Sequence, residues 1–315
     1  MRLCLATKIC AAGLAFGLGP TPLARAADPG PSSLTEKVQP YIACLNRHSG
    51  RAFDSRARYL SWSAKSGPTG KEKIVYGVYT LDDPADCSRG IEQANKMEPH
   101  DASLEKAGTD FATSLINLVP ALKEADDYYE QGDYKDDKMA KGKLLHPKLM
   151  AAWDSFAAAD TQLRAMVERI NDQIQLEHLA AIENQEGRKT SYYVLALMIK
   201  AKAVQRTERG DPAKDFDISQ AAQGLEALEA SIKDLEAYGD ANPGEKAGSI
   251  FLSAARSYLK SGKELMRRVR DKIPYNPGEK MLLGGQGSWM VEGSPAALTR
   301  NYNQLIERFN SSPRI

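Results

Sequence analysis

The segment 128–147, YYEQGDYKDDKMAKGKLLHP, gathers residue types that bind ligands or carry out acid–base chemistry. Tyrosine rings beside carboxylates can line a groove for a sugar or a peptide. Aspartates this close together could also hold a divalent cation weakly. The candidate ligand-binding residues of this region are Tyr128, Tyr129, Asp133, Tyr134, Asp137, His146 and Trp153.

The same segment also predicts a corner between two helices. Gly132 suits the left-handed position that follows a helix C-terminus, and Asp133 can cap the next helix. Pro147 lacks an N–H group, so we expect that helix to kink or restart near His146. A corner explains most of the segment, and its tyrosines could either seal the end of a bundle or line a groove.

Motifs for metal binding and catalysis do not occur in the sequence. The four histidines lack the helical spacings of metal ligands, and the aspartates of 133–137 lack the EF-hand spacing. Residues 67–72 fail the phosphate-loop pattern, and no serine lies in a G-x-S-x-G turn. We therefore expect no catalytic residues, no metal site and no cofactor, and keep divalent-ion binding at 133–137 as a weaker alternative.

The first 26 residues are typical of a secretory signal peptide. Arg2 and Lys8 are followed by an apolar run over 9–18, which is too short to cross a bilayer, and by an A-x-A site. We expect cleavage after Ala26 and a periplasmic chain with a disordered start over 27–33. Cys10 lacks the small preceding residues of an acylation signal, so we expect no lipid anchor there and no transmembrane helix in the mature chain.

Charge and cysteines bound the partners and the compartment. Cleavage would change the net charge from +1 to −2, which gives no global electrostatic reason to bind nucleic acid or an anionic membrane. The basic run 267–272 is short and reads as a solvated helix end, with a polyanion contact as the alternative. The mature chain keeps Cys44 and Cys87, which we expect to form a disulfide in an oxidising compartment.

Apolar residues recur every three or four positions through most of the chain, which indicates long helices. We expect helices over about 33–65, 101–131, 191–206, 217–238, 247–272 and 294–309, and others between 133 and 174. Residues 74–81, IVYGVYTL, predict the best strand. The glycine-rich segment 273–293 predicts a long loop, or a partner strand for 74–81. The predicted fold is an all-α, elongated multi-helix bundle with at most one short two-stranded ribbon, as a single domain over 34–311 with a possible sub-boundary near 210–215.

Three stretches of the sequence carry a resemblance to a known family: RYLSWSAKSGPTGKEKIVYGVY, YYEQGDYKDDKMAKGKLLHPKLMAAWDSF and GSPAALTRNYNQLIERFN. They resemble the YiiG-like family of bacterial envelope proteins, which is built on a domain of unknown function. The likeness covers about 41–310. It implies a mostly helical envelope protein and implies no reaction. Many members of the family look like lipoproteins, and this chain lacks the matching signal.

Two classes of function fit these observations. The first is a non-enzymatic binding or scaffold protein of the cell envelope, with an envelope protein, peptide or glycan as its partner. The second is an envelope hydrolase that acts on glycans or peptides at the corner 128–147. The hydrolase would need its aromatic and acidic residues to converge on one pocket.

Overall fold

The computed structural model describes residues 33–207, 216–245, 247–285 and 287–311. These residues confirm the prediction of an all-α multi-helix fold. Contacts divide the chain into two compact units that meet in sequence between Ile174 and Gln175. The expected signal peptide and the expected sub-boundary near 210–215 lie outside the described residues, and the single domain over 34–311 stays a prediction.

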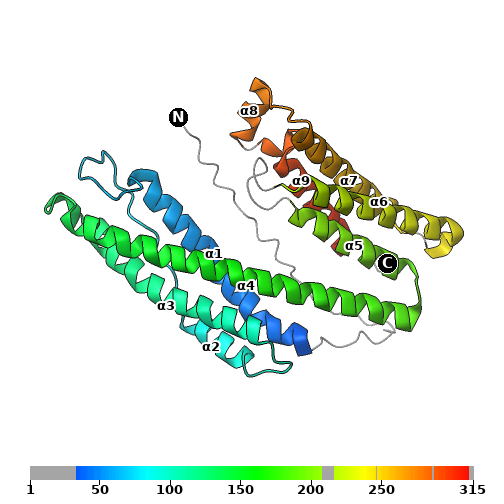
Figure 1. Cartoon of the computed structure of the whole chain (residues 1–315), viewed down its shortest axis with the longest axis horizontal. Coiled ribbons are helices and arrows are strands. Elements are labelled where there is room, and N and C mark those ends of the chain that lie inside the picture. The colour runs from blue at the N-terminus through cyan, green and yellow to red at the C-terminus, as the bar shows by residue number, and fades with distance from the viewer. Residues whose placement is uncertain (1–32, 208–215, 246, 286, 312–315) are drawn as a thin grey trace. The chain divides into compact units, whose positions relative to one another are not determined.

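Unit 1 takes its core from long helices with apolar stripes. Its elements are α1 (Ser33–Trp62), α2 (Ala85–Ala94), α3 (Ala102–Glu130), the short 3-10 helix η1 (Asp133–Lys135) and the first part of α4 (Ala140–Glu186) (Figure 1). On α1 the buried stripe repeats every three or four residues, as Leu34, Val38, Tyr41 and Leu45. One core cluster combines this stripe with side chains of α2, α3 and α4.

Polar side chains cross this core and fix one helix against another. The ammonium group of Lys37 is buried and donates to Glu105 Oε1 and to the carbonyl oxygen of Met97, both at 2.6 Å. The buried carboxylate of Asp160 accepts hydrogen bonds from Ser49 Oγ and, at 2.7 Å, from Arg164 Nε. Burying a charge is costly unless it is paired, so these links favour one arrangement of the helices.

The predicted strand over 74–81 is wrong, because no β-ladder forms there. Side chains of α1 hydrogen-bond its backbone instead. We call these side chains the α1 ladder: they are Arg51, Ser55, Arg58 and Trp62. The bonds run from Arg51 Nε to Thr80 O (3.1 Å), Ser55 Oγ to Tyr79 O (2.7 Å), Tyr79 N to Ser55 Oγ (3.0 Å), Arg58 Nε to Tyr76 O (2.7 Å) and Trp62 Nε1 to Gly77 O (2.9 Å).

The spacing of the α1 ladder explains how a helix can replace a strand. Steps of four, three and four residues place all its members on one face of α1. Backbone groups that leave water need hydrogen-bond partners, and this face supplies partners at four residues of the segment. The β-branched and aromatic composition of 74–81 therefore reflects an irregular segment that packs on a helix.

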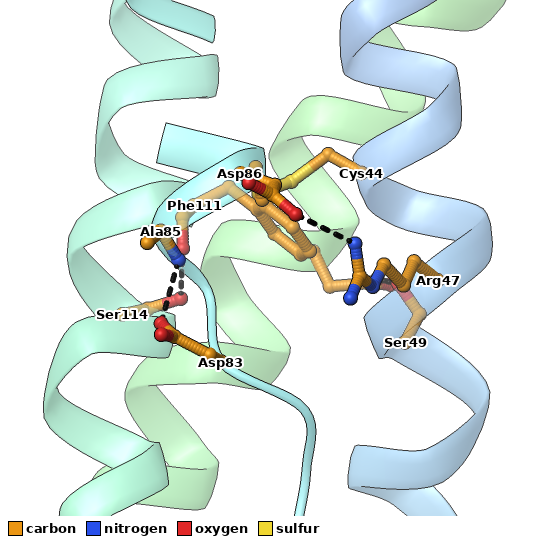
Figure 2. Close-up of a disulfide and its surroundings, with 10 residues drawn as sticks. Cys44, Arg47, Ser49, Asp83, Ala85, Asp86, Phe111 and Ser114 are labelled. Atoms are coloured by element: carbon orange, nitrogen blue, oxygen red, sulfur yellow. Dashed lines mark hydrogen bonds and ion pairs between the residues drawn. A yellow bond between two sulfur atoms is a disulfide. The ribbon is translucent and has the colours of Figure 1, made fainter. Parts of the chain in front are cut away.

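The disulfide prediction is confirmed. Cys44 on α1 is joined to Cys87 on α2, with their Cα atoms 5.1 Å apart, which is an ordinary separation for a bridge. Arg47 lies one turn further along α1 and forms an ion pair with Asp86 of α2 (Figure 2). The bridge closes a loop of the chain that contains the segment 74–81.

Unit 2 is a second helical core. Its elements are the rest of α4, α5 (Thr190–Arg206), α6 (Ile218–Ala241), η2 (Pro243–Glu245), α7 (Ser249–Arg270), α8 (Pro277–Leu283), η3 (Ser288–Met290) and α9 (Pro295–Ser311). Leucines and aromatic residues of α5, α6, α7 and α9 form its core. The loop or strand expected over 273–293 instead contains α8 and η3. Asn276 and Glu279 form a capping box at the start of α8, and Pro277 is the first residue of the helix.

No helix among the described residues is both long enough and apolar enough to span a bilayer.

Candidate functional site

The structure brings most of the predicted ligand-binding residues together, in the interior of unit 1. Tyr128, Tyr129 and Trp153 are at most 5 % exposed. Tyr129 contacts the ring of Tyr128 at a centroid distance of 4.9 Å and that of Trp62 at 5.1 Å. These rings fill the core where α3 ends and α4 begins. The groove-lining role that the sequence suggested for them stays a prediction.

Tyr128 and Asp137 close the corner. The Tyr128 hydroxyl donates to Asp137 Oδ1 at 2.7 Å, and burial together with this carboxylate raises the pKa of Tyr128 to about 12. Asp137 also accepts the N–H groups of Ala140 (3.2 Å) and Lys141 (2.8 Å). The N–H of Lys141, joined by the Tyr128 hydroxyl, lowers the pKa of Asp137. Asp137 thus satisfies the orphan donors at the start of α4.

Two details of the predicted corner are corrected. Asp133 starts η1 and does not cap the long helix, which begins at Ala140 after residues 138 and 139 take positive φ values. No helix restarts near His146, since α4 continues through Pro147, and the alternative of a kink there stays a prediction. Gly132 has φ 79°, as expected after the end of α3.

His146 is buried and faces α1 through its ring. Its Nδ1 atom lies 3.0 Å from the hydroxyl of Tyr59, and the two rings stack at 5.8 Å. Gly67, at φ 105°, packs its backbone over the His146 ring, where a Cβ atom would lie 3.1 Å from Cγ. Tyr59 therefore belongs to this cluster, although it is not among the predicted ligand-binding residues.

Asp133 and Tyr134 lie at the surface of the corner, where Asp133 is exposed and Tyr134 is half-buried. Lys135 lies 5.6 Å from the centre of the Tyr134 ring. Within the described ranges, no group of three or more His, Cys, Asp or Glu side chains is arranged to hold a metal ion.

A surface groove lies beside the α1 ladder, on residues that the sequence analysis did not select. Asp54, Arg58, Ser61, Tyr76 and Tyr79 line it, and its volume is ≈ 470 Å³. Tyr76 is 46 % exposed, so much of its ring faces solvent. The groove therefore offers an aromatic ring, hydroxyl groups, one guanidinium and one carboxylate to a ligand from solution.

Two arginine side chains lie over the Tyr79 ring, which lines this groove. The Arg58 guanidinium lies 4.5 Å from the centre of the Tyr79 ring and donates to its hydroxyl at 3.2 Å. Arg51 lies 4.0 Å from the same ring. Cation–π contacts of this kind are worth about 0.5–1 kcal/mol each at exposed sites. Burial raises the pKa of Asp126 on α3, Glu130 adds to that effect, and Arg58 opposes it, which places charges of both signs near the groove.

The sequence held one signal for this groove. Arg51, Ser55, Arg58 and Trp62 repeat at helical spacing on a stretch whose apolar stripe is interrupted, and the segment that follows contains two tyrosines. Polar residues repeating on one helix face indicate a polar partner, although the spacing does not say which segment it is.

Comparisons with known proteins place the whole described chain in one family. A family model described as "Protein of unknown function (DUF3829)" matches residues 32–311. The "Uncharacterized protein YiiG" of Escherichia coli (strain K12) is 34 % identical over 283 residues, which cover 88 % of this chain and 78 % of that protein. No solved structure matches significantly. The resemblance seen in the sequence is therefore confirmed, and the chain belongs to the YiiG-like family of proteins of unknown function.

Proposed function

We propose that this chain is a non-enzymatic binding protein of the bacterial cell envelope, and that its ligand occupies the groove of Asp54, Arg58, Ser61, Tyr76 and Tyr79. The observation that carries this proposal is the lining of the groove, which combines an exposed tyrosine ring with donors and acceptors on a rigid helix. Polar groups placed in this way fix the orientation of a ligand and provide specificity.

The lining favours binding over hydrolysis. Asp54 is the single carboxylate among the lining residues, whereas glycoside hydrolysis uses a pair of carboxylates on either side of the scissile bond. Tyr128, Tyr129 and Trp153, which a hydrolase at the corner would use, are buried in the core.

The ligand class that fits the groove best is a neutral glycan. Sugar hydroxyls can donate to Asp54 and accept from Arg58, and an apolar sugar face can lie on the Tyr76 ring. A strongly charged ligand of either sign would meet a group of like charge, because the groove contains Arg58 and Asp54, and Asp126 lies near Arg58. The mixed lining thus favours a ligand that carries many hydroxyl groups and little net charge.

The envelope location rests on the N-terminal sequence and the disulfide. The charged start, the apolar run and the A-x-A site support export with cleavage after Ala26. The Cys44–Cys87 pair supports an oxidising compartment such as the periplasm.

The test is a calorimetric titration of the mature chain with N-acetylhexosamine oligosaccharides, with and without an attached peptide, and with the free peptide. We expect both glycans to bind and Tyr76→Ala to weaken them by roughly tenfold, since one stacking contact is worth about 1 kcal/mol or more. Asp54→Asn should weaken them as well.

Tyr192→Ala is the matched control, because Tyr192 in unit 2 also lies under an arginine, at 5.2 Å from Arg188. It should leave glycan affinity unchanged. Binding of the free peptide alone, or equal glycan binding by Tyr76→Ala and the wild type, would contradict the proposal.

A further inference from the structure

We propose that one end of unit 2 docks on the surface of an anionic phospholipid bilayer. This surface, the α8 tip, consists of the exposed apolar residues Ile273, Met281, Trp289 and Met290 and the basic residues Arg267, Arg270, Lys272, Lys280 and Arg300. It lies where α7 ends, beside α8 (Figure 1). The inference is independent of the groove in unit 1.

The apolar residues of the α8 tip are unusually exposed. Met281 is 76 % exposed, Met290 53 %, Ile273 49 % and Trp289 43 %. All four lie within residues 273–290, and several exposed apolar side chains on one short stretch, unlike single scattered ones, indicate a site that contacts something other than water. Tryptophan in particular prefers the headgroup region of a bilayer, where its ring is buried and its N–H meets polar groups.

Local contacts hold together the segments that carry these residues. Arg268 of α7 forms an ion pair with Glu279 of α8 at 2.9 Å and lies 4.4 Å from the Tyr275 ring. The Tyr275 hydroxyl donates to the carbonyl oxygen of Gly293 at 3.2 Å, which ties the start of α8 to the segment after η3. A Cβ atom at Gly287 would meet both Met290 and Leu282, so η3 and α8 lie against each other.

The charge of the α8 tip selects the lipid. Residues 267–300 carry six basic and three acidic side chains, although the chain as a whole is almost neutral. Two of those acids are paired within the tip, Asp271 with Arg270 and Glu279 with Arg268. Lys272 and Lys280 are exposed beside the apolar residues. Each Lys or Arg near an anionic bilayer raises affinity by roughly fivefold.

Trp289 already contacts a cation. The Arg300 guanidinium lies 3.4 Å from the centre of its ring. With the ring in the headgroup layer, this guanidinium lies at the depth of the lipid phosphates, which it binds well through its fork of donors. The apolar ring and the cation are thus presented as one unit.

The test is co-sedimentation of the mature chain with vesicles of 30 % phosphatidylglycerol in phosphatidylcholine, and with pure phosphatidylcholine. We expect binding to the anionic vesicles that weakens steeply with added salt. The double variant Lys272→Gln/Lys280→Gln should lower the partition coefficient by roughly 25-fold. Met281→Ser/Met290→Ser should lower it by at least roughly tenfold, since it removes two exposed apolar groups.

Ile250→Ser/Lys233→Gln is the matched control. Ile250 is 66 % exposed at the opposite end of α7, and Lys233 on α6 is also exposed. Equal losses in this control, equal binding to neutral vesicles, or no binding to any vesicle would overturn the proposal. Gel filtration showing a dimer that Met281→Ser/Met290→Ser dissociates, without vesicle binding, would assign the α8 tip to a second copy of the chain.

Discussion

In unit 1 helix side chains and a disulfide hold a long irregular segment, whereas in unit 2 the described polar contacts join helices and short turns to one another. The α1 ladder, the Lys37–Glu105 pair and the Cys44–Cys87 bridge all lie in unit 1. The core of unit 2 is made of aliphatic and aromatic side chains from regular helices, and polar pairs such as Lys263–Glu229 link one helix to another.

The irregular segment of unit 1 explains this difference. Helices satisfy their own backbone, so helices that pack on helices need only apolar side chains between them. Residues 63–84 form no helix, and their backbone depends on side chains of α1. The unit that carries the extra segment also carries the candidate groove, which the same side chains shape.

The largest effect is expected from Glu105→Gln. It leaves the buried ammonium of Lys37 without its counter-charge, and we expect unit 1 to lose about 3–5 kcal/mol of stability. Hydrogen exchange followed by mass spectrometry should show the loss in peptides of α1 and α3. Glu229→Gln in unit 2 is the control, because Glu229 pairs with the partly exposed Lys263 at the same 2.6 Å and should change little. An equal loss in both variants would remove the contrast between the units.

Removal of the disulfide is expected to have the next largest effect. Cys44 and Cys87 are separated by 43 residues, and a bridge over such a loop is worth about 2–4 kcal/mol. The variant Cys44→Ser/Cys87→Ser, or the reduced wild type, should unfold at a lower denaturant concentration and lose protection first in α2 and 63–84. Loss of protection in both units together would show that they unfold as one.

The smallest effect is expected from Ser55→Ala. It removes the partner of both the N–H and the carbonyl of Tyr79, which should cost about 1–3 kcal/mol and raise exchange mainly in 74–81. Ser114→Ala is the control, since this buried serine bonds only the carbonyl of Phe111 in its own helix. Unchanged exchange in 74–81 would show that the segment does not depend on the α1 ladder.

Much of the fold follows from local patterns in the sequence. The 3.6-residue period gave the long helices, and Gly132 was correctly placed after α3. The cap was misplaced because Asp133 and Asp137 are chemically alike, and only the path of residues 138 and 139 decides which of them meets the start of α4. The strand prediction failed because a β-rich composition describes an extended segment without saying what its backbone bonds to.

The candidate site divides in the same way. Residue type alone selected Tyr128, Tyr129 and Trp153 as candidates. Whether a ring is buried depends on how the helices pack, and all three rings are buried in the core. Tyr76 and Tyr79 looked like ordinary strand residues, but both line the groove, where Tyr76 is exposed and Tyr79 is half-buried.

The sequence by itself determined the helical class, the family, the pairing of the two cysteines and the residue types available for binding, because periodicity, motif and composition are local or countable. Tertiary structure alone decided which aromatic rings face water, since that depends on where 74–81 lies against α1. A backbone without a strand partner must take its hydrogen bonds from whichever side chains come within reach, and only the folded chain brings Arg51, Ser55, Arg58 and Trp62 to it.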